Sequence, residues 1–235
     1  MLQKLSQQII AIGGGGFSPT TGTCTPIDKY ILNLPNKKFP KISFLPTATG
    51  DSQIYIDKFY KAFTSQDCYP THYSIFKNNH LDVESYILDQ DIIYVGGGNT
   101  VNMLVLWKAR GLDKILEKAL EKGVILCGIS AGSLCWFDSG NTDSFGKMDK
   151  IDCLGFLPYS NSPHFDSEIT REPNFTNLIE TNQIPAGYGV EEGVALHFIN
   201  GELKKTIREN STGVAYFINI KEKIISKQSI LPENI

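Results

Sequence analysis

The stretch from Val124 to Phe137 constrains the fold of this chain more than any other part of it. Val124 to Cys127 is a short apolar run that predicts a buried strand, and Ser133 to Phe137 predicts the first turns of an apolar helix. Between them, Gly128-Ile-Ser-Ala-Gly132 has the Gly-x-Ser-x-Gly pattern of a nucleophile elbow. An incidental serine in a glycine-rich turn is the plainer interpretation. The strand before the turn and the helix after it favour the elbow, in which small neighbours let the chain reverse and expose the Ser130 hydroxyl.

Length and composition limit the class of protein. The 235 residues are enough for a buried core, and we expect a single domain over residues 1–235. A net charge of −3 and the lack of a long basic run do not indicate a surface for nucleic acid or anionic membrane. The first residues are too polar for a secretory signal and no apolar run could span a bilayer, so the expected location is cytoplasmic.

Cysteines and glycines argue against a metal or a cofactor. The five cysteines are an odd number without a Cys-x-x-Cys pair, which favours buried, reduced thiols over disulfides or a zinc site. Gly13 to Gly16 follow the first predicted strand, but Pro19 comes almost at once and no helix start is set up for a phosphate. A loop whose backbone passes close to another element explains these glycines better than a dinucleotide site. No cofactor and no metal are expected.

Strands alternate with helices through the first half of the chain. The predicted strands are Ile9–Ile12, Lys41–Leu45, Cys68–Phe76 and Asp91–Val95, and the predicted helices are Ser52–Ser65, Asp82–Leu88, Val101–Ala109 and Leu112–Lys122. This alternation predicts an α/β fold with a mostly parallel central sheet and helices on both faces.

The second half has a different character. Asp138 to Lys150 is polar and contains glycine, and it is longer than an ordinary connection. A helix over Thr170–Thr181 and several short strands follow, with Asn200-Gly201 as a hairpin turn. We therefore expect extra β-hairpins in this half, and a frayed polar C-terminus.

A serine nucleophile needs a base within hydrogen-bond reach and an acid that orients the base. Among the four histidines, His164 is the preferred base, because it lies downstream of the elbow in a loop that small polar residues introduce. His72 and His197 lie in strand patterns, and His80 lies in a polar loop.

Two carboxylates are candidates for the orienting acid. Asp143 lies between the elbow and His164, and Glu192 lies at a strand end beyond it. The residues alone do not decide between them. Gly96 to Gly98 end the strand that precedes the elbow strand, so their backbone is expected beside Ser130, where an N–H group could complete an oxyanion hole.

Three motifs together resemble the peptidase E family of serine peptidases, which includes aspartyl dipeptidase. They are Val95-Gly-Gly-Gly-Asn-Thr100, Gly128-Ile-Ser-Ala-Gly132 and Ser162-Pro-His-Phe165, in the family's order and at about its spacing. The resemblance implies a fold like that of class I glutamine amidotransferases. It also implies the site residues: Ser130 as nucleophile, His164 as base, Gly98 and Ala131 as oxyanion donors, Arg171 as partner of an acidic substrate side chain, and Asn99 as a further substrate contact.

The third member of the triad is where the sequence departs from aspartyl dipeptidase. The aspartate of that enzyme follows the nucleophile by slightly more residues than Asp143 does here. In the related cyanophycinase a glutamate has the role, and Gly189-Val-Glu-Glu192 resembles its surroundings. We therefore prefer Glu192 and keep Asp143 as the second candidate.

Three functions compete on this basis. The first is a serine peptidase that cleaves short peptides, with dipeptides that begin with Asp as one substrate class. The second is a cyanophycinase-like isopeptidase, and the third is an inactive binding protein on the same fold, against which the intact Ser130 and His164 argue. A glutaminase would need cysteine at position 130, and an α/β-hydrolase would have its histidine much further along the chain. The expected partner is a small peptide, and a homodimer is left open.

Overall fold

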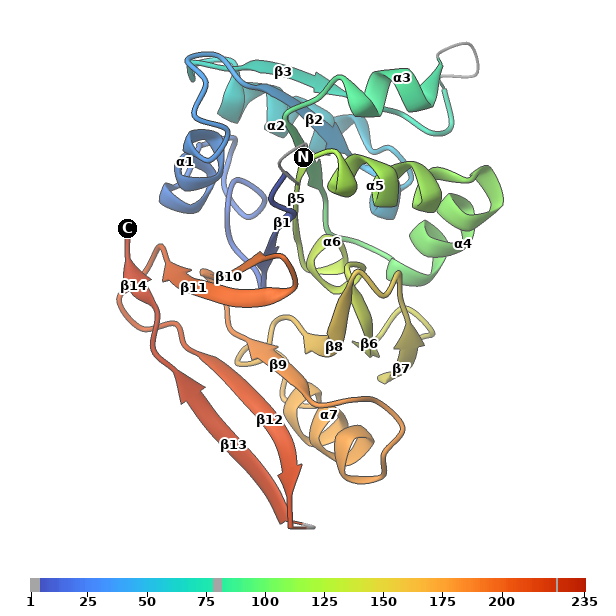
Figure 1. Cartoon of the computed structure of the whole chain (residues 1–235), viewed down its shortest axis with the longest axis vertical. Coiled ribbons are helices and arrows are strands. Elements are labelled where there is room, and N and C mark those ends of the chain that lie inside the picture. Colours follow the sequence, from blue (N-terminus) through green and yellow to red (C-terminus); the bar gives the residue numbers. More distant parts are fainter. Residues whose placement is uncertain (1–4, 78–81, 223) are drawn as a thin grey trace.

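The computed structural model describes residues 5–77, 82–222 and 224–235, and its larger sheet has eight strands in the order β14-β11-β10-β1-β5-β4-β2-β3 (Figure 1). Five neighbouring strands run parallel: β1, β5, β4, β2 and β3. Strand β10 is antiparallel to β1 and to β11. The prediction of a mostly parallel central sheet is confirmed. The strands are β1 Gln8–Ile12, β2 Lys41–Leu45, β3 Tyr69–His72, β4 Ile92–Val95, β5 Ile125–Ile129, β10 Val194–Ile199, β11 Glu202–Arg208 and β14 Glu233–Asn234.

Helices cover both faces of this sheet because successive strand residues point to opposite sides. Ile10 and Ile12 of β1 belong to a core cluster with α1 and α2, whereas Ile9 and Ala11 belong to a cluster with α4 and α5. The helices on the first face are α1 Pro26–Asn33 and α2 Gln53–Phe63, and those on the second are α3 Val83–Leu88, α4 Thr100–Arg110 and α5 Leu112–Glu121. Both predicted helical layers are therefore present.

The second half of the chain builds a separate six-stranded sheet, in the order β13-β12-β9-β8-β6-β7. Its strands are β6 Phe137–Thr142, β7 Asp149–Asp152, β8 Leu157–Ser162, β9 Gly187–Val190, β12 Ala215–Lys221 and β13 Ile224–Ile230, and α7 Arg171–Glu180 packs against it. Strands β6, β8 and β9 are parallel, and antiparallel neighbours flank them. The carboxyl ends of β8 and β9 therefore lie side by side.

The two sheets share one hydrophobic cluster. Phe137 and Tyr188 of the smaller sheet pack on Phe198 of the larger one, with ring centroids 5.7 and 5.4 Å apart. Their packing seats the ends of β8 and β9 beside the ends of β1 and β5. In the part of the chain that the structure describes, no helix has the length and apolar character needed to cross a bilayer.

One prediction about the chain after Ser130 is wrong. The helix after Ser130 is the single turn α6 Ala131–Leu134, and Phe137 already belongs to β6. The polar segment after it forms β6 and β7, and polar side chains such as Asn141 are buried there because they find hydrogen-bond partners in α7.

The structure differs from the expectations at three further places. The C-terminus is not frayed, since β13 pairs with β12 along its whole length through backbone hydrogen bonds that its polar side chains do not reveal. Helix α1 was not predicted, although Thr25 and Asp28 form a capping box and Pro26 opens the helix. The strand expected over residues 68–76 is shorter, Tyr69–His72.

Candidate active site

Ser130 follows the central strand β5, between the ends of β1 and β4. Its φ of 56° and ψ of −112° are strained for a residue with a side chain, as expected at a nucleophile elbow. Its N–H donates to Ile12 O at 3.0 Å, and its carbonyl accepts from the N–H groups of Ser133 and Leu134 at 2.9 Å. The two glycines of the motif are needed for space, since a Cβ on Gly128 or on Gly132 would overlap a backbone carbonyl.

Two backbone N–H groups beside Ser130 have no hydrogen-bond partner among the described residues. One belongs to Ala131, the first residue of α6, and the other to Gly98, which follows β4 with φ 135°. The neighbouring N–H groups of Gly97 and Asn99 donate instead to Tyr55 Oη at 3.3 Å and to Ala48 O at 2.8 Å. Neither of the predicted oxyanion donors is therefore engaged by another group of the described chain.

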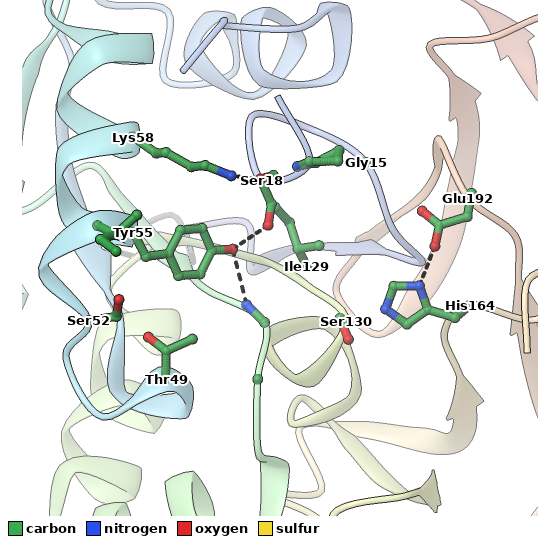
Figure 2. Close-up of a pocket in the computed structure, with 14 residues that line it drawn as sticks. Gly15, Ser18, Thr49, Ser52, Tyr55, Lys58, Ile129, Ser130, His164 and Glu192 are labelled. Carbon is green, nitrogen blue, oxygen red and sulfur yellow. Dashed lines mark hydrogen bonds and ion pairs between the residues drawn. The ribbon is translucent and has the colours of Figure 1, made fainter. Parts of the chain in front are cut away.

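His164 and Glu192 approach Ser130 from the smaller sheet. His164 follows β8 and Glu192 follows β9, and Nδ1 of His164 hydrogen-bonds Oε1 of Glu192 (Figure 2). That hydrogen bond is the main reason why the pKa of Glu192 lies below its usual value, so the carboxylate is ionised. With Nδ1 as the donor, Nε2 of His164 is left as an acceptor, and it has no partner within the described chain.

Gly13 and Gly14 hold these two residues in place. Gly13 O accepts the N–H of His164 at 3.2 Å, and Gly14 O accepts that of Gly193 at 2.8 Å. A Cβ at position 14 would overlap the Glu192 carboxylate, and one at position 13 would overlap the carbonyl of Val190. The prediction that this glycine loop passes close to another element is confirmed.

A pocket of about 510 Å³ opens around Ser130. It lies between α2, the ends of β4 and β5, and the His164–Glu192 pair (Figure 2). The lining residues are Gly15, Ser18, Pro19, Thr49, Ser52, Ile54, Tyr55, Lys58, Gly97, Gly98, Ile129, Ser130, His164 and Glu192. Four of the predicted site residues, Ser130, His164, Glu192 and Gly98, therefore share one cavity, and Ala131 is buried directly after Ser130.

Three predicted site residues lie outside this lining. Asp143 is exposed in the turn between β6 and β7, and its side chain makes no hydrogen bond within the described chain. Asn99 caps α4 by accepting from Asn102 N–H at 2.8 Å. Arg171 is 4% exposed, and its guanidinium is held by Glu168 at 2.8 and 3.2 Å and by Asn141 O at 3.2 Å. The structure does not bring these three residues to Ser130.

The remaining histidines have other hydrogen-bond partners or lie outside the described residues. His72 bonds Tyr60 Oη at 2.8 Å. His197 lies between Tyr30 and Gln8, and burial lowers its pKa to about 4, so it is neutral. His80 lies outside the described residues. All five cysteines are unpaired, and no cluster of metal-ligating side chains occurs in the described ranges.

Tyr55 and Lys58 are among the residues of the pocket wall that sequence reasoning missed. Tyr55 and Lys58 lie one turn apart on α2 and face the cavity, where Tyr55 Oη also donates to Ser18 Oγ at 2.7 Å. Their spacing fits an ordinary helix face, so no sequence signal separates them from structural residues. The sequence shows Gly13 and Gly14 as part of a glycine run. It does not show that Val190 and Glu192 are the residues whose close approach requires glycine there.

The chain is similar to known proteins. The sequence model of Peptidase family S51 matches residues 9–206. The chain belongs to peptidase family S51. An uncharacterized peptidase of Bacillus subtilis strain 168, YgaJ, is 48% identical to it over 221 residues, which cover 94% of this chain and 96% of the relative. A peptidase function follows from membership of this family, and the peptidase E resemblance is confirmed.

More distant relatives extend the match. Peptidase E of Citrobacter koseri is 29% identical over 170 residues, covering 68% of this chain and 73% of that protein. The crystal structure of a peptidase from an acI-B1 Actinobacterium superposes with a TM-score of 0.71 at 14% identity, covering 97% of this chain and 95% of the other. At that identity the superposition supports the fold alone.

Proposed function

We propose that this protein is a serine peptidase that hydrolyses short peptides through an acyl-enzyme at Ser130. The observation that carries the proposal is the convergence of three elements on one pocket: the strained Ser130 turn, the unpartnered N–H groups of Gly98 and Ala131, and the His164–Glu192 pair. A nucleophile, an oxyanion hole and an oriented base are the parts that acyl transfer needs.

The proposed reaction has two halves. His164 Nε2 takes the Ser130 hydroxyl proton as Oγ attacks the scissile carbonyl carbon, and the carbonyl oxygen becomes an oxyanion that the two N–H groups stabilise. The intermediate collapses when His164 returns the proton to the leaving amine, which breaks the C–N bond and leaves an ester on Ser130. Water, activated by His164 in the same way, then hydrolyses the ester and restores the serine.

Glu192 has the role of the orienting acid in this proposal. Its ionised carboxylate fixes the tautomer of His164 and stabilises the imidazolium that forms during attack. The size of the pocket favours short substrates, because about 510 Å³ is in the range of sites that enclose a small molecule. Dipeptides that begin with Asp are the substrates to test first.

A cyanophycinase-like isopeptidase is the second candidate. The pairing of His164 with a glutamate, and not with Asp143, is the arrangement that the resemblance assigns to cyanophycinase. The chemistry at Ser130 would be the same, so only the substrate separates the two functions.

The test is a substrate panel with wild-type protein and Ser130→Ala. Dipeptides with Asp and with neutral residues at the first position are compared with isoaspartyl peptides and an aspartate–arginine isopeptide. We expect hydrolysis of α-linked dipeptides, and a loss of about a millionfold in Ser130→Ala with an unchanged circular dichroism spectrum. Cleavage of the isopeptides alone would favour the second candidate. Activity of Ser130→Ala above a few per cent of wild type would contradict the role of Ser130, and wild-type protein inactive on the whole panel would favour a binding protein.

A further inference from the structure

Lys58 is the one Lys or Arg among the described residues that line the pocket around Ser130. Its half-buried side chain extends from α2, and its Nζ donates one hydrogen bond, to Ser18 O at 2.9 Å. An ammonium group carries three donors, so two remain for a ligand. Within the described part of the chain Lys58 forms no ion pair, so no carboxylate of the described residues neutralises this charge on the pocket wall.

The other cation expected at this site is already occupied. Arg171 is buried, and two hydrogen bonds tie its guanidinium to the carboxylate of Glu168. To reach the Arg171 guanidinium, a substrate carboxylate would have to displace Glu168. It would also have to lie outside the pocket that Ser130 lines. The charge that can meet a substrate anion is therefore on Lys58.

The position of His164 indicates which part of a substrate meets Lys58. The leaving amine must receive its proton from His164 and so lies on that side of Ser130. The residue that becomes the acyl group extends from the carbonyl carbon in another direction. In Figure 2, Lys58, Ser18 and Tyr55 lie across the pocket from His164 and Glu192, with Ser130 between the two groups.

We propose that Lys58 is a specificity-determining residue whose ammonium group binds a carboxylate of the substrate. The inference rests on the proposed function, because it takes Ser130 as the nucleophile. The geometry assigns the carboxylate to the side chain of the acyl residue. The C-terminal carboxylate of a dipeptide has the same chemistry, and the experiment separates these two sources.

The first measurement compares kcat/KM of wild type, Lys58→Met, Lys58→Arg and Lys61→Met. Lys61 is a matched control, since it is an exposed lysine one turn further along α2 and outside the pocket lining. The substrates are Asp-Leu and Asn-Leu, which differ by one charge, and the C-terminal amides of both.

Lys58→Met should lower kcat/KM for Asp-Leu and its amide about 10- to 100-fold, the range expected for a hydrogen bond to a charged group. The loss on Asn-Leu should stay under about threefold. Lys58→Arg should keep most of the preference for Asp-Leu, and Lys61→Met should match wild type.

The other outcomes are also decisive. If Lys58→Met lowers kcat/KM equally for Asp-Leu and Asn-Leu, but not for their C-terminal amides, Lys58 binds the C-terminal carboxylate. Equal losses on all four peptides, or no loss on any, would overturn the proposal.

Binding to an inactive variant keeps this test separate from the proposed function. Ser130→Ala protein, with and without Lys58→Met, is titrated with the same four peptides by calorimetry. Wild-type protein that hydrolyses none of them would contradict the proposed peptidase activity, while the titration still decides the role of Lys58. The proposal is supported if removal of a substrate carboxylate weakens binding and Lys58→Met abolishes this difference. It is overturned if peptides with and without the carboxylates bind equally well.

Discussion

The carboxylates of Glu192 and Asp143 differ in what holds them. Glu192 follows β9, accepts hydrogen bonds from His164 and Ser167, and lies against Gly14. Asp143 lies in an exposed turn and contacts none of these residues. An acid can fix the tautomer of a histidine only from a rigid platform within hydrogen-bond reach, so the proposed triad contains Glu192.

Exchange of the two carboxylates for amides tests this assignment. Glu192→Gln should lower kcat about 10³- to 10⁴-fold, as the loss of the orienting acid does in other triads. Asp143→Asn should cost about tenfold or less, and serves as the matched control. Steady-state kinetics on one dipeptide checks both. A larger loss in Asp143→Asn than in Glu192→Gln would reverse the assignment.

Gly14 should act through Glu192. Gly14→Ala places a methyl group where the carboxylate now lies, so Glu192 must move away from His164. We expect kcat to fall at least about a hundredfold, while thermal unfolding still shows one cooperative transition. The control is the double variant with Glu192→Gln, in which the added loss should be small because the two changes remove the same interaction. Fully additive losses would mean that Gly14 has another role.

The residues of the site differ in how far the sequence alone predicts them. Ser130, His164 and Glu192 were predicted because short motifs surround them, whereas Tyr55 and Lys58 carry no local pattern and gain their position only when α2 packs beside β4. Arg171 shows the reverse case. It fits a motif, but in this chain Glu168, one turn before it, takes its guanidinium.

At the scale of elements, α2 supports the loop that follows β4. Tyr55 Oη accepts the N–H of Gly97 and donates to Ser18, so one buried hydroxyl ties the oxyanion loop to the loop after β1. The neighbouring Gly98 N–H is left pointing to no protein acceptor in the described chain. The helix thereby fixes the backbone that the proposed oxyanion hole requires.

Tyr55→Phe tests this link. Loss of the hydroxyl leaves the Gly97 N–H without its acceptor and loosens the loop, and we expect kcat to fall about 3- to 10-fold, the value of one neutral hydrogen bond. The matched control is Tyr60→Phe on the same helix, whose hydroxyl contacts His72 away from the pocket. Equal activity in the two variants would show that Tyr55 does not support the loop.

The helices and strands of the first half of the chain could be predicted from the sequence, because apolar periodicity marks the faces on which they pack together. The second half was less so. The strands β6 and β13 carry many polar residues, and backbone hydrogen bonds pair them with β7, β8 and β12 although no alternating apolar face marks them. Local propensity does not contain that information.

At the scale of the whole molecule, the site lies where the two sheets meet. Ser130 follows a strand of the larger sheet, and His164 and Glu192 follow two parallel strands of the smaller one. The Gly13–Gly14 loop joins them through backbone contacts, including the bridge between Gly14 and Glu192. The sequence predicted the fold class and the motifs, but not a second sheet, because strand order depends on contacts between distant segments.

Stability should depend on pH through Asp28, which is buried in the first turn of α1 and hydrogen-bonded to Tyr94 and Thr25. Burial raises its pKa from 3.8 to about 6, so the folded state binds a proton that the unfolded state has released between these values. This group contributes most stability below about pH 4, and the contribution is lost as pH rises through 6.

Asp28→Asn should remove that dependence. Relative to the variant, wild-type protein should lose of order 2–3 kcal/mol in the free energy of unfolding between pH 4 and pH 7, as two pKa units imply. Urea unfolding at several pH values measures the difference between the two proteins. Parallel pH profiles would show that Asp28 ionises in the folded state as it does in the unfolded one.

The proposed peptidase reaction requires that Ser130 becomes acylated, and intact-mass analysis during turnover detects that acyl group. Wild-type protein is mixed with an activated ester of Asp or of a neutral amino acid and quenched with acid within milliseconds. The modified residue is then identified by proteolysis and mass analysis of the peptides. We predict an acyl adduct on the peptide that contains Ser130 in wild type and none in Ser130→Ala. An adduct on another residue, or dipeptide hydrolysis by Ser130→Ala at the wild-type rate, would contradict the account.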